Sequence, residues 1–591
     1  MAESSLKEKI DRVTYVINLD GSPMKDEYDV LTIHVERDIN KISRAKVAIL
    51  LPWGTGEDEA FTISEAADFK PGVEMEIKVG YDSEEETIFK GLIVKHGLKS
   101  RGGKRSQLII KCLDEAIKLC LGEKTKVFAE QTDSAIISSV ISGGGLSADV
   151  ESTTYTHKQL FQYQSVDWDF IMNRAEANGL LVYTEDGKVL VKKPLASGSA
   201  ELKVNYNDDV FDFDGEVDAS FQLPSAVAEG WDFASQEFVS GNSEEPSLIS
   251  QGNLTGTALA EVLGVDEVKY QFSSPMEADE LKGVANGALV RSRLSAMRGR
   301  VSFFGNSKPK LNTLIQIEGF GERFNGDALI TSIRHEVVEG SWRTEVGFGL
   351  SPEWYHHRHP ERGHILPSIG GLQNGIVKKI DEDPGGEHRI QVNIPVTGAD
   401  TWARLTTFYT TNAQGIFFMP EVGDEVILGF LCNDPRYPII LGSLYSSKNA
   451  PAYTADAENT IKAFTTKAEL KIELNDKDKV LTIETPGKNS IVISDKDKKI
   501  TIKDQNSNTI EMSSDGISLK SGKDVNIEAT GKMTLKAAQA ITVQSSGGDV
   551  ALKGLNVNAN GQVGAVVKGG ATAELSAGGQ TTVKGAMVMI N

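Results

Sequence analysis

Histidines supply the densest group of potential metal ligands in the chain, within residues 356–364. Neutral imidazoles at such density could bind zinc, nickel or copper. No cysteine or clear carboxylate pair accompanies them, and Pro360 and Gly363 disfavour a helix that would present ligands at positions i and i+4. We therefore expect a solvated linker without a specific metal site, where any bound metal would be adventitious. The four residues are His356, His357, His359 and His364.

Other runs with suggestive composition lack the spacing that chemistry needs. The acidic runs at 82–86 and 381–384 do not have the ligand spacing of an EF-hand loop, so we interpret them as solvated turns. The three glycines at 143–145 lack the Lys-Ser/Thr of a phosphate-binding loop and follow a helical pattern, which predicts a helix stop. No G-x-S-x-G or H-E-x-x-H run occurs. The sequence thus predicts no catalytic residue, no metal site and no cofactor.

Composition narrows the class of protein. A formal net charge of -21 argues against nucleic acid as a partner, because phosphate binding needs clustered Lys and Arg. The chain shows no basic stretch followed by an apolar run at its start, and no apolar stretch approaching about 18 residues. The cysteines Cys112, Cys120 and Cys432 are too few for a disulfide framework. We expect a protein made in the cytoplasm with reduced thiols and without a signal peptide.

Alternating apolar and polar residues dominate the first 350 residues and predict antiparallel β-barrels. We assign a first barrel to residues 1–115 and a second to 191–350, with a mixed insertion at 229–286. Residues 116–190, between the barrels, carry two helices and a hairpin. The helices are expected from Asp133, as N-cap, to Gly143 and from Ser165 to Gly179, and the hairpin turns at Asp186 and Gly187.

The remaining residues divide into two linkers, a small barrel and a repeat. Residues 351–371 are rich in Pro, Gly, His and charge, which is typical of a connector. Five strand candidates within 372–450 suit a Greek-key barrel of the OB type. A second linker at 451–466 leads to residues 467–591, a monotonous series of short β segments.

The repeat has a period of eight residues, with apolar side chains at i and i+2 of each octad. This pattern places a narrow apolar stripe on one face of every short strand. A single chain can neither cover the stripe nor pair the strand edges, so three chains around a common axis are expected to form a triangular β-prism. The predicted core of the prism comprises Ile517, Leu519, Val525, Ile527, Met533, Leu535, Ile541 and Val543.

Two motifs carry a family resemblance. The more specific is PEVGDEVILGFLCNDPRYPIILGSLY at residues 420–445, and the second is FQYQSVDWDFIMNRAEANGLLVYTEDG at 161–187. In their order, these parts resemble the VgrG family of type VI secretion systems and the hub and spike proteins of phage-like contractile injection systems. The resemblance implies a mainly β fold, with two hub β-barrels, a small helical insertion, an OB-fold barrel and a C-terminal trimeric intertwined β-helix.

The resemblance also implies a function, namely a non-enzymatic hub and membrane-puncturing spike at the tip of a contractile injection system. Expected partners of the homotrimer are baseplate proteins, an Hcp-like inner tube, effector cargo and the target membrane. The protein would stay in the cytoplasm within the particle until firing, and then be delivered outside or into the target cell. In the family, a PAAR-repeat tip protein caps the spike. Its predicted docking residues are Met587, Val588, Met589, Ile590 and Asn591.

Two other classes of protein compete with this interpretation. A polysaccharide-degrading tailspike enzyme would need paired carboxylates, whereas the acids of the octads are scattered. A trimeric β-stalk adhesin is disfavoured because the sequence shows no signal peptide or membrane anchor. The sequence does not distinguish a membrane-anchored machine from a released particle, nor does it identify the cargo or the target cell.

Overall fold

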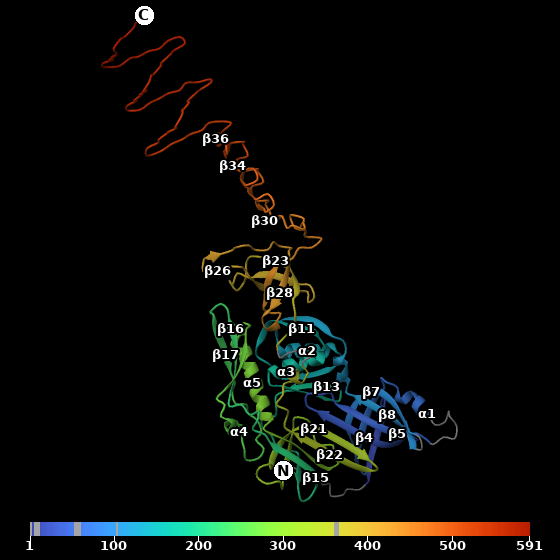
Figure 1. The fold of residues 1–591 in the computed structure, drawn as a ribbon. Helices are drawn as coiled ribbons and strands as arrows, with labels where there is room; N and C mark the ends of the chain where they lie inside the picture. The colour runs from blue at the N-terminus through green and yellow to red at the C-terminus, as the bar shows by residue number, and fades with distance from the viewer. Residues whose placement is uncertain (1–2, 5–11, 53–60, 102–103, 360–365, 591) are drawn as a thin grey trace. The chain divides into compact units, whose positions relative to one another are not determined.

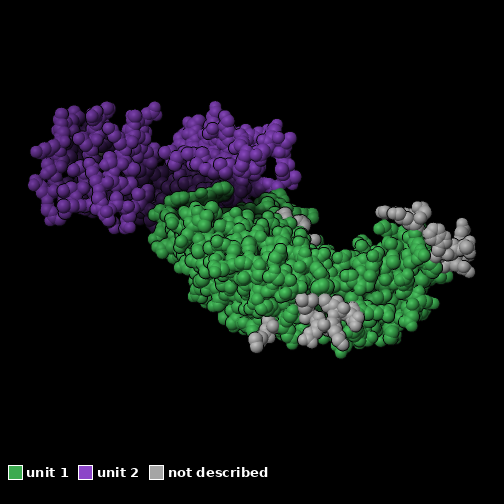
Figure 2. Space-filling view, turned by 90° about the horizontal axis from the view of Figure 1, so that it is seen from below, with its two compact units in different colours: residues 1–451 green, residues 452–591 purple. Residues whose placement is uncertain are grey.

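The computed structural model describes residues 3–4, 12–52, 61–101, 104–359 and 366–590. It divides the chain into two compact units, Met1–Pro451 and Ala452–Asn591 (Figures 1 and 2). Strands predominate over helices in both units, so the predicted mainly β fold is confirmed.

One 14-stranded sheet forms the frame of the first unit. From residue 13 onward, the N-terminal strands pair antiparallel with one another, and β5 and β6 alternate between buried and less buried residues, as the period-two pattern predicts. Their core contains Phe69, Phe89 and Met75, all fully buried. The elements are β1 (Glu3–Ser4), β2 (Val13–Leu19), β3 (Ser22–Pro23), β4 (Asp29–Asp38), β5 (Arg44–Leu50), α1 (Thr62–Glu65), η1 (Ala67–Phe69), β6 (Glu74–Tyr81), β7 (Glu84–Arg101) and β8 (Lys104–Leu113).

The strands of the second predicted barrel join the same sheet. Strand β21 pairs antiparallel with β4, so that Val337 lies opposite Ile33. Val337 and Trp342 pack into the N-terminal core, whereas Phe303 and Val346 belong to a separate core of the second part. The strands of the two predicted hub barrels therefore form one continuous sheet with two cores. The elements are β14 (Leu202–Asn205), β15 (Val210–Val217), β19 (Met297–Phe304), β20 (Leu314–Glu318), β21 (Gly326–Val338) and β22 (Ser341–Phe348).

A helical part lies between these strands in the sequence, as predicted. Helix α2 is capped by the Thr132 hydroxyl, which accepts from the Ala135 amide, so the predicted cap at Asp133 is wrong. Asp133 is the first helical residue and its side chain is buried. The helix ends at Gly143, as predicted. The elements are η2 (Glu115–Cys120), β9 (Lys124–Thr132), α2 (Asp133–Gly143), β10 (Ser147–Val150), β11 (Thr156–Ser165), α3 (Asp167–Ala177), β12 (Leu181–Glu185) and β13 (Lys188–Lys192).

The mixed insertion contains the longest helix that the structure describes. Helix α5 packs beside β16 and β17 (Figure 1) and buries Leu281, Val284 and Ala288 at helical spacing. Sequence analysis did not identify this helix. The elements are β16 (Ala226–Asp232), β17 (Glu237–Asn242), α4 (Gly256–Ala260), η3 (Glu261–Leu263), β18 (Val268–Phe272) and α5 (Ala278–Leu294).

The connector after the sheet is less solvated than predicted. It contains the four-residue helix α6 (Tyr355–Arg358). Trp354, Tyr355 and Ile369 are buried, because the first two pack into the cores around α5 and α3. The expectation of a solvated linker is therefore wrong for these residues.

A closed five-stranded barrel follows and confirms the predicted OB-type barrel. Its small core contains Val392, Val426 and Ile440, which lie on three of its strands. A two-stranded hairpin, β26–β27, projects from this barrel (Figure 1). The elements are β23 (Gln373–Lys379), β24 (Ile390–Ile394), β25 (Ala399–Leu405), β26 (Thr410–Thr411), β27 (Gln414–Gly415), β28 (Glu425–Phe430), η5 (Leu431–Asn433) and β29 (Pro438–Ser443).

The second unit begins with a seven-stranded antiparallel sheet, here called the ladder. Each strand has five residues and pairs with the next strand along the chain. Its first strand lies within the segment predicted as a linker. The strands are β30 (Ile461–Thr465), β31 (Lys471–Asn475), β32 (Val480–Glu484), β33 (Ser490–Ser494), β34 (Lys499–Lys503), β35 (Thr509–Ser513) and β36 (Gly516–Lys520).

Candidate functional site

Two apolar columns run along one face of the ladder. From β31 onward, the second residue of one strand lies opposite the fourth of the next, so apolar residues meet apolar residues at each of these steps. Ile472 lies opposite Ile483 and Leu474 lies opposite Leu481. One column is Ile472, Ile483, Ile491, Ile502, Ile510 and Leu519, and the other is Leu474, Leu481, Ile493, Ile500, Met512 and Ile517.

Much of this face is uncovered in a single copy. Ile491 is 39 % exposed and Ile502 40 %, values that are high for aliphatic residues in the middle of a sheet. The first column also lines a shallow groove. The opposite face carries polar and charged residues, such as the Lys499–Glu511 ion pair at 3.4 Å. The ladder is therefore an amphipathic sheet whose apolar face has no cover within the described part of its own unit.

The chain changes character after β36. Between Ser521 and Ile590, the described residues form no strand, and bends recur every eight residues, as at 522–523, 530–531 and 538–539. Extended segments lie between the bends, as the zigzag in Figure 1 shows. We call residues 521–590 the tail. The predicted core residues Ile517 and Leu519 lie in β36, while Val525, Ile527, Met533, Leu535, Ile541 and Val543 lie in the tail, all at least 50 % exposed.

The predicted tip residues are also exposed. Met587 is 79 % exposed, Met589 77 % and Ile590 91 %. Val588 is 50 % exposed, and Asn591 lies outside the described residues. Four adjacent apolar side chains at the end of the described chain would leave a hydrophobic surface.

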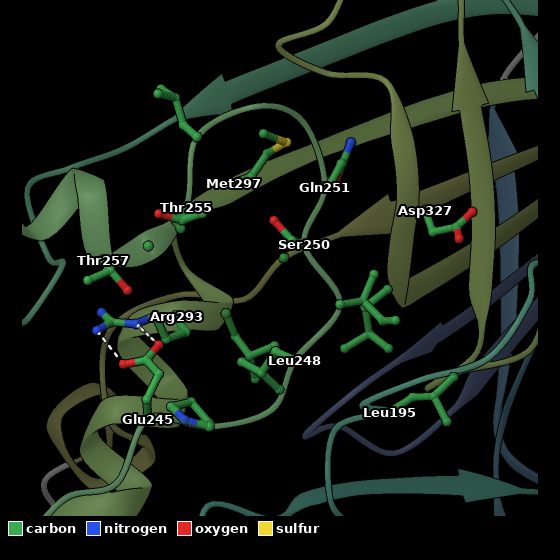
Figure 3. Close-up of a pocket in the computed structure, with 18 residues that line it drawn as sticks. Leu195, Glu245, Leu248, Ser250, Gln251, Thr255, Thr257, Arg293, Met297 and Asp327 are labelled. Atoms are coloured by element: carbon green, nitrogen blue, oxygen red, sulfur yellow. Dashed lines mark hydrogen bonds and ion pairs between the residues drawn. The ribbon is translucent and has the colours of Figure 1, made fainter.

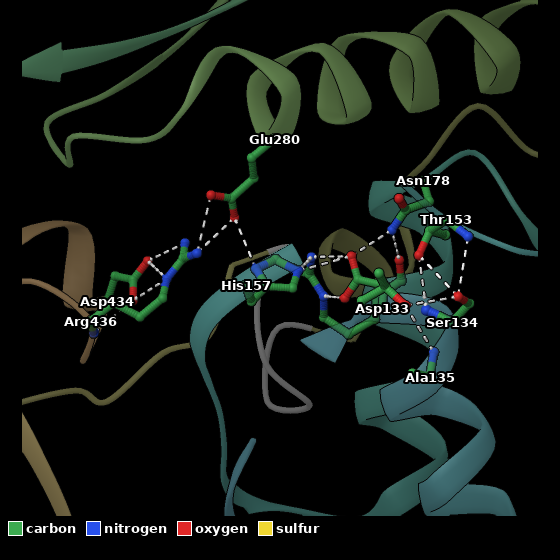
Figure 4. Close-up of polar contacts among 11 residues, drawn as sticks. Asp133, Ser134, Ala135, Thr153, His157, Asn178, Glu280, Asp434 and Arg436 are labelled. Atoms are coloured by element: carbon green, nitrogen blue, oxygen red, sulfur yellow. Dashed lines mark hydrogen bonds and ion pairs between the residues drawn. The ribbon is translucent and has the colours of Figure 1, made fainter. Parts of the chain in front are cut away.

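A buried ion network links the helical part to the OB barrel (Figure 4). Arg174 of α3 donates two hydrogen bonds to Asp133, at 2.7 and 2.8 Å. His157 of β11 lies 3.2 Å from Asp133 through Nε2 and 4.0 Å from Glu280 of α5 through Nδ1. Arg436 then donates to Glu280 at 2.9 Å and to Asp434 at 2.7 Å. The network thus joins α2, α3, β11 and α5 to the turn before β29.

Electrostatics explains why charges persist in this buried place. Burial by itself would raise the pKa of Asp133, but Arg174 and His157 hold that pKa well below its usual range. Burial would lower the pKa of Arg436, yet Asp434 and Glu280 raise it well above its usual value. Such a network favours one relative placement of its elements, because separation of Arg174 from Asp133 would leave two buried charges apart.

A cavity of about 270 Å³ lies under the loop that leads to α4 (Figure 3). Its arginine, Arg293, is engaged by Glu245 through hydrogen bonds of 2.7 and 2.9 Å. Thr255 caps α4 by accepting from the Ala258 amide. None of the 18 described lining residues is histidine or cysteine.

The histidine cluster is only partly described. The rings of His356 and His357 pack edge to face, with their centroids 4.3 Å apart, and the His359 ring packs near Tyr355. His364 lies outside the described residues. Within the ranges that the structure describes, no group of three or more His, Cys, Asp or Glu side chains could hold a metal ion. No helix in those ranges is long and apolar enough to span a membrane.

Sequence reasoning missed the ion network. The motif at 420–445 predicts turns and strands, and Asp434 and Arg436 do form such a turn. In the sequence, the local signal for the network is an arginine directly after an Asp-Pro turn. Its partner Glu280 is distant in sequence, so the pair itself has no local signal.

Two family models match the chain. The Alg8 N-terminal domain matches residues 9–339, and the type VI secretion system/phage-baseplate injector OB domain matches residues 373–445. The second match covers the closed barrel.

Curated proteins match over shorter ranges. The type VI secretion system spike protein VgrG5 of Pseudomonas aeruginosa is 28% identical over 148 residues, covering 23% of this chain and 19% of that protein. The actin cross-linking toxin VgrG1 of Vibrio cholerae is 23% identical over 379 residues, covering 58% and 33% respectively. The matches thus span about a fifth and a third of these relatives.

A solved structure shares the fold. The chain superposes on the Francisella PdpA-VgrG complex, in its lidded form, with a TM-score of 0.53 and 9% sequence identity. The match covers 86% of this chain and 80% of that one. A lidless form of the complex gives a TM-score of 0.52.

Proposed function

The chain belongs to the family of the Alg8 N-terminal domain and is related to the VgrG spike proteins, and we propose that it is the hub and membrane-puncturing spike of a contractile injection system. The observation that carries this proposal is the uncovered apolar face of the ladder, continued by the eight-residue repeat of the tail. A needle needs such a surface, because its stiffness comes from chains that pack around a dry axis.

The proposed assembly is a homotrimer. Three ladders that turn their columns toward one axis would remove from water the side chains that a single copy exposes. In the tail, each extended segment with two apolar residues would gain edge partners from neighbouring chains. The ladder and tail residues would together form the core of the spike.

Light scattering of the purified chain at micromolar concentration tests this proposal. We expect three times the monomer mass of 64.0 kDa. A monodisperse monomer with native β-sheet circular dichroism would overturn it. A variant with Ile491 and Ile502 replaced by Ser should shift the protein toward monomer. Substitution of Thr482 and Thr501, which lie on the polar face, by Ser is the matched control.

The proposed partners divide between the two ends of the chain. Baseplate proteins and an Hcp-like tube would bind the hub, while effector cargo would travel with the particle to the target membrane. The apolar residues Met587–Ile590 would form a platform for a PAAR-repeat tip protein. Deletion of residues 587–591 should leave the trimer intact and abolish co-purification of that protein. Unchanged binding would place the cap elsewhere.

We propose a structural role without catalysis for this chain. The relative VgrG1 is named an actin cross-linking toxin, but the chain matches only 33% of that protein. The arginine of the described cavity under the α4 loop is paired with Glu245. Incubation with peptidoglycan or polysaccharide should give no turnover. Reproducible turnover that one Asp or Glu substitution abolishes would contradict this proposal.

A further inference from the structure

The hairpin of the OB barrel exposes an unusual number of aromatic side chains. We call residues 408–418 the aromatic arm. Phe408 is 100% exposed, Phe417 82% and Tyr409 56%. The arm contains no Asp, Glu, Lys or Arg. Exposed aromatic residues without charges among them are typical of the centre of a protein–protein interface.

The arm is held by its own backbone. Thr410 pairs with Gly415 and Thr411 with Gln414, and the Ile416 amide donates to the Tyr409 carbonyl at 3.0 Å. Strands β26 and β27 pair only with each other among the described strands. The arm therefore has a defined shape although the barrel core does not bury its rings.

A second apolar surface lies on the outside of the same barrel. Leu372 is 60% exposed and Leu441 49%. Both border the bare backbone of Gly429, because a Cβ added there would lie 3.6 Å from Leu441 Cδ1 and 3.9 Å from Leu372 Cδ2. We call Leu372, Gly429 and Leu441 the barrel patch. Two leucines beside a glycine leave a shallow seat into which a ring could pack.

The two surfaces suit neighbouring copies of the chain. They are different surfaces of one barrel, so contact between the arm of one copy and the patch of another is heterologous. A heterologous contact closes into a ring when the copies are related by a closed rotation, and the proposed trimer supplies a threefold axis. Only 17 residues separate Ser443 of β29 from Ile461 of β30. That segment can span at most about 60 Å, which limits how far each barrel can lie from the shared axis once the ladders associate.

We propose that the aromatic arm of each copy packs on the barrel patch of the next copy and closes a ring of three barrels. This inference rests on the trimer of the proposed function. The ring would join the copies at a level separate from the ladder, through aromatic contacts where the ladder uses aliphatic columns.

Cross-linking tests the inference directly. In a background with Cys120 and Cys432 replaced by Ser, the double variant F417C/L441C is treated with a short bismaleimide. Cys112 is fully buried and stays in place. We expect a covalent trimer on a denaturing gel, because each arm would be joined to the next barrel. A control pairs F417C with L121C, since Leu121 is a similarly exposed leucine of the hub, and should give no covalent trimer.

The outcomes separate the inference from the trimer itself. If light scattering shows a trimer but the double variant gives only internally linked monomers or no link, the ring is wrong and the proposed function stands. Covalent dimers from F417C alone would show that arms meet arms, which also overturns the ring. If the untreated protein is a monomer, the trimer fails and the ring fails with it. Addition of F408S to the double variant should reduce the yield of covalent trimer severalfold.

Discussion

The two units of the chain differ in which kinds of side chain they bury and which they expose. The first unit buries charged side chains, such as Asp133 and Arg174, and satisfies them with one another. The second unit exposes aliphatic side chains, such as Ile491 and Ile502, that a single copy does not cover. Charges that are paired internally make a unit self-sufficient, whereas an uncovered apolar face makes it depend on partners. We infer that the first unit folds alone and that the second completes its fold by association.

Truncation gives the largest expected effect. A chain that ends at Thr460 keeps the described cores of the first unit and should be a monomer at micromolar concentration, because the arm and the patch of the proposed ring are brought together only when the ladders associate. A chain that ends at Lys520 keeps all seven ladder strands and should have three times its monomer mass. Light scattering distinguishes the two results. A trimer without residues 461–591 would show that the first unit carries the main contacts.

Substitution within the ladder should have the next largest effect. Ile493 and Val492 are neighbours on opposite faces of β33. Replacement of Ile493 by Ser should cost about 2 kcal/mol per copy, hence about 6 kcal/mol per trimer, because its side chain would be buried at the axis. The Val492→Ser control should change the midpoint of thermal unfolding of the trimer far less. Equal effects of the two substitutions would contradict the assignment of faces.

Loss of a network charge should destabilise the first unit alone. Replacement of Arg174 by Met leaves the buried Asp133 carboxylate without its arginine partner, with an expected loss of about 3–5 kcal/mol in the free energy of unfolding. All six tryptophans lie before residue 451, so their fluorescence in denaturant follows this unit selectively. The control Lys488→Met removes an exposed ladder ion pair and should leave that transition unchanged. If both variants lowered the free energy of this unfolding transition by similar amounts, the proposed difference between the two units would be wrong.

A smaller effect should appear on acidification. Burial lowers the pKa of His335 to about 3. Between the unfolded value, about 6.5, and about 3, the unfolded chain binds a proton that the folded chain does not, so stability falls as pH falls. The expected slope is at most about 1.4 kcal/mol per pH unit. Asp133 adds no loss in the upper part of this window, because its folded pKa is depressed and its contribution is lost only as pH falls further.

Denaturant unfolding at pH 4.5 and pH 7, followed by tryptophan fluorescence, measures this slope. Trp342 lies near His335, with ring centroids 5.9 Å apart. A His335→Gln variant should show a flatter dependence on pH. An identical slope in the variant would assign the pH dependence to another group.

The sequence predicted elements that depend on local pattern. The eight-residue spacing from Ile517 to Val543 reappears as bends at equal intervals, and the end of α2 at Gly143 follows from its glycine stop. The alternation in β28 likewise predicted a barrel strand.

Features that depend on distant partners escaped prediction. Asp133 has a side chain that could cap a helix. In the structure, this side chain is buried and accepts a hydrogen bond from Arg174, and Thr132 caps the helix instead. Arg436 forms hydrogen bonds with Glu280, which is 156 residues away in the sequence, so no local pattern predicts that pair. Helix α5 was not predicted because Gly283 and Gly287 weaken the helical pattern of its sequence. A Cβ at Gly287 would lie 2.5 Å from the Glu176 carbonyl oxygen, so close packing against α3 requires glycine at this position.

The pairing of β4 with β21 has a consequence for synthesis of the chain on the ribosome. Asp38 meets Ser332, so the edge of β4 waits for a strand that lies 294 residues further along the sequence. At roughly 5–20 residues per second, translation takes about 15–60 s to supply that strand. During this interval, an unpaired edge beside Ile33 and Val35 can accept a strand from another nascent chain. A polysome that translates this message therefore brings open edges of several unfinished chains close together, and the cell must keep them apart until β21 emerges.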